Sequence, residues 1–128
     1  MTSELMSLTW VTTLTALMWM PYILNLIAVR GLMDAVGYPE DPKPLSPWAA
    51  KMKAAHSNAV ENLVVFAALV LIANAADVSN AVTVLACQIY FWARLVHLLS
   101  YTFAIPWVRT LAFVAGFGCQ VAIVLQLI

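Results

Sequence analysis

The chain contains few charged residues for its length. Only 9% of its 128 residues are charged, six basic and six acidic, and the formal net charge is zero. Soluble domains average about 25% charged residues, so this composition excludes an ordinary soluble protein. Nucleic-acid-binding domains carry a basic patch or stripe that this balance does not supply. We therefore expect no nucleic-acid partner.

Cysteine is also scarce. The two cysteines, Cys87 and Cys119, both lie inside apolar segments. Their spacing matches no metal-binding or redox motif, so we predict no metal site. A free cysteine in such surroundings behaves as a small apolar side chain, and we expect both to be buried.

Apolar residues, by contrast, make up 64% of the chain. A membrane-spanning helix needs about 20 consecutive, largely apolar residues. Segments 5–30, 50–76, 79–104 and 107–127 meet this requirement. The sequence therefore predicts an all-α integral membrane four-helix bundle that forms a single domain over residues 1–128. The first segment lacks a basic start and a small-residue cleavage site, so we interpret it as a retained helix, bent at Pro21.

The connections and the basic residues predict an orientation. The longest connection, 31–48, contains the proline-rich run YPEDPKPLSP, which cannot form a regular helix. A short joint at 77–79 and a turn at Ile105 and Pro106 separate the remaining segments. The positive-inside rule places the 31–48 loop and the Pro106 turn in the cytoplasm and both termini outside. This rule uses the basic residues that border these two connections, Arg30, Lys43, Lys51, Lys53 and Arg109. We expect a bacterial inner-membrane protein.

Two charged side chains fall at similar depth inside the predicted membrane. At 1.5 Å per residue, Glu61 lies about 18 Å into the second span and Arg94 about 15 Å into the third, both from the loop side. A charge at this depth costs about 2.5–3.5 kcal/mol on insertion scales. We therefore expect a Glu61–Arg94 ion pair, direct or through water.

Other polar residues fall on helical stripes near the same side. Residues three and four apart share one face of a helix. One stripe in the second span contains Ala54, Ser57, Asn58 and Glu61, and one in the third contains Tyr90, Arg94, His97 and Tyr101. With Arg30 and Arg109 at the boundary, they indicate a polar pocket suited to an amphiphilic ligand. The alternative is structural: the Glu61–Arg94 pair locks the bundle, and Lys51 and Lys53 only anchor it at the interface.

Three short motifs carry a resemblance to a known family. They are H-x-N-x-x-E-N (His56, Asn58, Glu61, Asn62), R-x-x-H-x-x-x-Y (Arg94, His97, Tyr101) and P-x-x-R-[ST] (Pro106, Arg109, Thr110). In this order, on four spans with a long first loop, they resemble the MAPEG family, the membrane-associated proteins of eicosanoid and glutathione metabolism. The resemblance covers nearly the whole chain.

The resemblance implies a left-handed four-helix bundle that assembles as a homotrimer in lipid. Glutathione would lie near the cytosolic side between neighbouring subunits, as the co-substrate of a transferase or peroxidase that acts on lipophilic electrophiles. Arg109 would stabilise the thiolate, because an adjacent guanidinium favours the anionic form of a thiol. The residues expected to bind glutathione are Asn58, Glu61, His97, Tyr101 and, from the adjacent subunit, Arg30.

The sequence also departs from the family pattern. Ala54 and Ser57 stand where glutathione-using members carry arginine, and Phe113 stands where some carry tyrosine, which leaves Thr110 as the candidate hydroxyl donor. These departures keep open a non-catalytic alternative, a lipid-binding or accessory subunit of a larger membrane complex. A small four-span multidrug carrier is disfavoured, because the first span has no acidic residue between Leu5 and Arg30.

Overall fold

The fold consists of helices and their connections. The computed structural model describes residues 1–128, and its elements are six α-helices without strands. Four helical segments are long and apolar enough to cross a membrane: Ser3–Arg30, Pro47–Ala75, Ala81–Thr102 and Val108–Leu127. Their bounds agree with the predicted spans to within one helical turn. The prediction of an all-α, four-span integral membrane protein is confirmed.

The first span is interrupted near its middle. Helix α1 (Ser3–Leu17) ends one residue before Met18, and α2 (Trp19–Arg30) follows directly. Pro21 explains the break, because proline has no N–H to donate to the Leu17 carbonyl and its ring crowds that carbonyl. The predicted bend at Pro21 is thus confirmed, with the interruption one turn earlier.

The connection after α2 contains a short helix that the sequence did not predict. Gly31, at φ 80°, ends α2 in a conformation that favours glycine, and α3 (Leu32–Val36) follows. Residues 37–46 are not helical, which confirms the interpretation of the proline-rich run.

The last three spans begin with distinct local signals. Helix α4 (Pro47–Ala75) has proline in its first turn, where the missing N–H is not needed. Helix α5 (Ala81–Thr102) begins with a capping box between Asn80 and Thr83. Helix α6 (Val108–Leu127) begins after Trp107, whose φ is 67°. Pro106 therefore precedes the new helix and does not start it.

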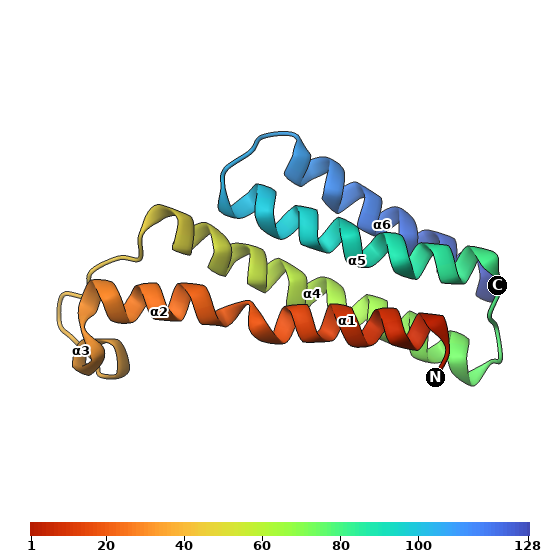
Figure 1. The fold of residues 1–128 in the computed structure, drawn as a ribbon, viewed down its shortest axis with the longest axis horizontal. Helices are drawn as coiled ribbons and strands as arrows, with labels where there is room; N and C mark the ends of the chain where they lie inside the picture. Colours follow the sequence, from red (N-terminus) through yellow and green to blue (C-terminus); the bar gives the residue numbers. More distant parts are fainter.

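The long helices lie side by side in an elongated bundle (Figure 1). Helix α5 pairs with α6 and α1, and α4 contacts α1, α2, α5 and α6. Helix α2 and the first turns of α4 extend beyond the α5–α6 turn (Figure 1). We call the end with residues 31–46 and this turn the loop end, and the end with both termini the terminal end.

Two apolar clusters form the core. One lies in the terminal half and centres on Phe66 and Tyr90, whose rings stack with centroids 3.8 Å apart. The other lies toward the loop end and includes Met18, Tyr22 and Leu98. The bundle thus leaves a middle region, between these clusters, for buried polar side chains.

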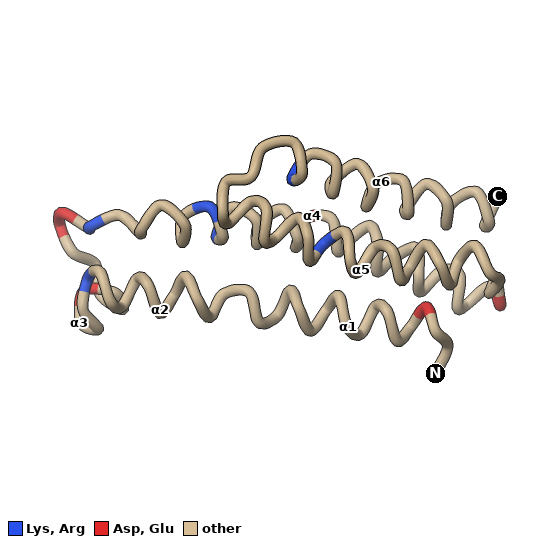
Figure 2. The backbone as a smooth tube through the Cα atoms, turned by 45° about the horizontal axis from the view of Figure 1, so that its top comes forward, with Lys and Arg blue, Asp and Glu red and all other residues tan.

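Charged residues are distributed unevenly along the bundle. Figure 2 shows the basic residues near the loop end, except for one in the middle of α5, which is Arg94. Acidic Glu4 and Asp77 lie at the terminal end. Glu4 is only 4% exposed, and its Oε1 accepts hydrogen bonds from Ser79 Oγ at 2.8 Å and Thr83 Oγ1 at 2.6 Å. The burial of Glu4 was not predicted.

Candidate functional site

Arg94 is the most deeply buried charged group near the loop half. Its side chain is 5% exposed, and its Nη2 donates to Asn58 Oδ1 at 2.7 Å. The same nitrogen lies 3.4 Å from Nδ1 of His97, while Nε has no partner. Its hydrogen-bond partners are thus an amide and an imidazole, and neither neutralises the guanidinium charge. An unsatisfied buried donor of this kind can still bind an acceptor.

The predicted direct ion pair between Arg94 and Glu61 is wrong. Glu61 lies exposed on α4, whereas Asn58, one turn earlier, is half-buried and bonded to Arg94. The two residues differ by about 60° around the helix at 3.6 residues per turn, so only one of them can face α5. Of the expected stripe on α4, only Asn58 is therefore half-buried, and Ala54, Ser57 and Glu61 are exposed.

Further hydrogen bonds extend the Arg94 contact across three helices. Asn62 Nδ2 donates to the Asn58 carbonyl at 2.9 Å and lies 3.3 Å from Asn58 Oδ1. Gln120 Nε2, on α6, donates to the Asn62 carbonyl at 3.4 Å. These contacts connect α6, α4 and α5 in the middle of the bundle. They fix the position of Asn58 and, through it, that of Arg94.

A second group of contacts leads from Arg94 to the loop end. His97 is 3% exposed and meets the Tyr101 ring edge-on, with centroids 5.7 Å apart. The guanidinium carbon of Arg109 lies 4.6 Å from the centroid of the Tyr101 ring. This geometry is a cation–π contact between α6 and α5. Arg94, His97, Tyr101 and Arg109 therefore form one continuous row.

A cavity opens beside this row. Its volume is about 230 Å³, and its lining combines two cations and two hydroxyl groups with apolar turn residues. The lining residues are Lys51, Ser100, Tyr101, Ala104, Ile105, Pro106 and Arg109. Two cations and a phenol around one space can hold carboxylate groups by charge and hydrogen bonding.

The other predicted site residues lie elsewhere. Arg30 Nε donates to the Lys43 carbonyl at 2.7 Å in the loop, away from the cavity. Thr110 is exposed and does not line the cavity. Glu61, also exposed, makes no hydrogen bond within the chain. The single chain thus brings together Asn58, His97, Tyr101 and Arg109, and leaves Arg30, Glu61 and Thr110 apart.

Comparison with known protein families identifies the family of the chain. The model of the family described as MAPEG matches residues 8–128, nearly the whole chain. The chain belongs to the MAPEG family. It matches no curated protein and no solved structure.

Two residues gain a role that the sequence did not predict for this MAPEG chain. Lys51, interpreted as an interface anchor, lines the cavity with Arg109, whereas Lys53 does not. Gly116 on α6 faces α5, where a Cβ atom would lie 3.5 Å from the Tyr90 ring and 4.0 Å from Cδ of Arg94. At these distances a Cβ atom would make ordinary van der Waals contacts, so Gly116 lies at the close contact of α6 with Tyr90 and Arg94 of α5.

The family departures can also be placed. Ala54 and Ser57 are exposed on α4 and lie outside the cavity. Phe113 lies beside His97, with ring centroids 6.4 Å apart. His56 turns away from Arg94, since its Nδ1 lies 2.6 Å from the Tyr22 hydroxyl. His56 therefore does not share the stripe of Asn58.

Proposed function

We propose that the chain is a glutathione-dependent transferase or peroxidase that acts on lipophilic electrophiles. The observation that carries the proposal is the row from Arg94 to Arg109 beside a cavity with a second cation, Lys51. Membership of the MAPEG family is consistent with glutathione chemistry, and the row lies where a polar co-substrate and a lipid-borne substrate could meet.

The lining of the cavity fits an anionic tripeptide. Lys51 and Arg109 supply positive charge for carboxylates, and the phenol of Tyr101 supplies a hydrogen-bond donor. Lys51 supplies a cation inside the cavity, whereas Ala54 and Ser57 lie outside it. Arg94 Nε, buried without a partner, is a further donor at the inner end of the row.

Arg109 has the role closest to the reaction in this proposal. Its guanidinium is exposed at one side and lies over the Tyr101 ring on the other, which restricts its orientation. Beside a thiol, it would favour the thiolate. The thiolate sulfur then attacks an electrophilic carbon, and the leaving group departs with its electron pair. In the peroxidase reaction, two thiols form a disulfide as a hydroperoxide is reduced to an alcohol and water.

The exposed Glu61 supports the assembly of several copies. An exposed carboxylate about 18 Å along a spanning helix cannot face lipid without a large cost, so it needs a polar neighbour or water. We propose that a second copy supplies this neighbour and that the assembly is a homotrimer. Glu61 would then accept from the amino group of glutathione, and Arg30 would approach from the adjacent subunit.

The orientation completes the proposal. Five of the six basic residues lie near the loop end, the exception being Arg94 (Figure 2). They are Arg30, Lys43, Lys51, Lys53 and, at the α5–α6 turn, Arg109. By the positive-inside rule this end faces the cytoplasm, where glutathione is available, and the membrane is a bacterial inner membrane.

A second candidate function is favoured by Ala54 and Ser57. Both positions lack the arginines of glutathione-using members and face outward on α4. A non-catalytic subunit that binds lipid or a larger membrane complex would not need these cations. Co-purification with a stoichiometric partner from native membranes would favour this alternative.

The test uses the purified protein with glutathione and 1-chloro-2,4-dinitrobenzene, a generic electrophile. The proposal expects glutathione-dependent conjugation, with most of the rate lost in Arg109→Ala and retained in the control Lys53→Ala. Equal rates for the parent chain and Arg109→Ala, or no conjugation above the uncatalysed rate, would contradict it.

A further inference from the structure

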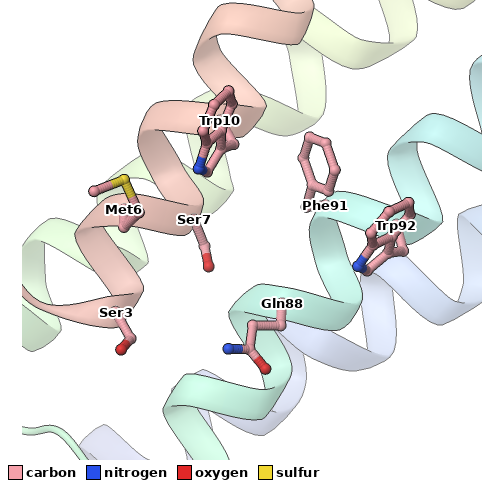
Figure 3. A pocket seen from close by; sticks show the side chains of 7 residues that line it. All are labelled: Ser3, Met6, Ser7, Trp10, Gln88, Phe91 and Trp92. Atoms are coloured by element: carbon pink, nitrogen blue, oxygen red, sulfur yellow. The ribbon is translucent and has the colours of Figure 1, made fainter.

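A larger cavity lies on the other half of the bundle, between α1 and α5. Its volume is about 460 Å³, within the usual range for small-molecule sites. Three tryptophan or phenylalanine rings, three uncharged polar side chains and a methionine line it. They are Ser3, Met6, Ser7, Trp10, Gln88, Phe91 and Trp92 (Figure 3). We call this space the α1–α5 groove.

The polar groups of the groove have no partners within the chain. Ser7 and Gln88 point from opposite helices into the space between α1 and α5 (Figure 3). Ser7 is only 8% exposed, so its hydroxyl lies on the floor of the groove. No side-chain hydrogen bond within the chain involves Ser7, Gln88 or the indole N–H groups of Trp10 and Trp92. Polar groups that face lipid without partners are unfavourable, so the groove favours a ligand that forms hydrogen bonds with them.

The lining also defines the charge of the ligand. The groove contains no charged residue. Gln88 lies about 10 Å along α5 and Ser7 about 6 Å along α1 from the terminal end, at 1.5 Å per residue. A charged headgroup at this depth would have no counter-charge and would lose its hydration. The ligand is therefore uncharged where it contacts the groove.

The hydrogen-bond donors and the aromatic surface of the groove define the rest of the ligand's chemistry. Two indole N–H groups, an amide and two hydroxyls can all donate hydrogen bonds, which favours an acceptor such as a carbonyl oxygen. Trp10 and Trp92 are 57% and 61% exposed, and present apolar faces to a flat ring or a chain. We propose that the α1–α5 groove binds an uncharged amphiphile whose carbonyl oxygens meet Gln88 and Ser7 and whose apolar part lies along Trp10 and Trp92.

A second copy of the chain is a poorer occupant of the groove. Helices α1 and α5 pack directly against each other, so the Ser7 hydroxyl is recessed between them. A helix about 10 Å in diameter would rest on the rims of the groove and would enter it only with single side chains. A ring or a single chain is narrow enough. The groove lies on the opposite half of the bundle from the row of Arg94 to Arg109, and its ligand does not depend on glutathione.

The carbonyl chemistry could come from a quinone ring or from the ester groups of a glycerolipid. The test titrates the purified, delipidated protein with decyl-benzoquinone and follows quenching of tryptophan fluorescence. We expect saturable quenching in the parent chain and at least ten-fold weaker binding in Gln88→Leu. Asn74→Leu, an exposed polar residue of α4 outside the groove, is the control and should match the parent chain.

Competition identifies the source of the carbonyl group. If dioctanoylglycerol displaces the quinone, the groove also binds glycerol esters. If it does not, the groove binds only the quinone ring. Both outcomes agree with the proposal. Quenching that rises linearly, equal binding to Gln88→Leu, or equal displacement by a decyl sulfate anion would overturn it. A covalent dimer formed by Gln88→Cys in native membranes, absent from the parent chain, would show a second copy in the groove and would also overturn it.

Discussion

Arg94 Nη2 donates to Asn58 Oδ1 at 2.7 Å, and this bond ties α5 to α4 in the middle of the bundle. Asn58 is itself held by Asn62, which accepts from Gln120. A buried guanidinium thus depends on an amide and not on a carboxylate. The contact makes Asn58 a positioning residue for Arg94.

The first prediction concerns this contact. Asn58→Leu removes the acceptor and leaves the buried Arg94 without its short hydrogen bond, so the free energy of unfolding should fall by about 1.5–3 kcal/mol. The double variant Asn58→Leu/Arg94→Met should lose less free energy of unfolding than the sum of the losses in the two single variants, because the two groups interact directly. Thermal unfolding of the four proteins in detergent measures this coupling. Strictly additive changes would contradict it.

A second prediction separates the two lysines at the start of α4. Lys51 lines the cavity with Arg109, whereas Lys53 is exposed outside it. Lys51→Ala should weaken glutathione binding by about 1.5–3 kcal/mol, the usual worth of a hydrogen bond to a charged group. Lys53→Ala should leave it unchanged. Titration of both variants by calorimetry is the measurement, and equal affinities for the two variants would contradict the assignment of Lys51.

The third prediction concerns the stacking of Arg109 on Tyr101. Tyr101→Phe keeps the aromatic face at 4.6 Å from the guanidinium, whereas Tyr101→Leu removes it. A cation–π contact contributes about 0.5–2 kcal/mol, so Tyr101→Leu should slow conjugation by about two- to thirty-fold through loss of Arg109 orientation. Any loss in Tyr101→Phe reports the hydroxyl alone. If both variants lose the same activity, the stacking has no role in positioning Arg109.

The sequence was sufficient to predict the spans and much of the polar row. Long apolar segments leave little alternative to spanning helices in a chain with so few charges. Spacing of three and four residues placed Arg94, His97 and Tyr101 on one face of α5, and all three lie in one row. The break near Pro21 also followed from the chemistry of one residue.

The errors came from information that spacing does not contain. Glu61 lies at about the same depth along its helix as Arg94 does along α5. It points in another direction around the helix, however, so Asn58 and not Glu61 contacts Arg94. The position of Lys51 in the cavity lining was not predictable, because only the fold shows that the α5–α6 turn lies beside it. The burial of Glu4 depends on Ser79 and Thr83, which lie far along the chain and donate to it, so local sequence does not reveal it.

A fourth prediction follows from the burial of Glu4. Thr83 Oγ1 donates to Glu4 Oε1 at 2.6 Å, and Thr83 is fully buried. Thr83→Val keeps the shape but removes the donor to Glu4 and the capping-box acceptor of the Asn80 N–H, so the protein should lose about 1–3 kcal/mol of stability or more. Thr13→Val is the matched control, because the exposed Thr13 hydroxyl bonds only to the Thr9 carbonyl of its own helix. Similar unfolding temperatures for both variants would show that the Glu4 contact does not stabilise the fold.

The central claim is that the row from Arg94 to Arg109 and its cavity bind glutathione. Calorimetric titration of glutathione, at millimolar concentrations, into the purified full chain in its native oligomer tests this most directly. The account predicts saturable heat in the parent chain, and loss of most of that heat in the double variant Lys51→Ala/Arg109→Ala. The absence of saturable heat in the parent chain, or an unchanged isotherm in the double variant, would contradict it.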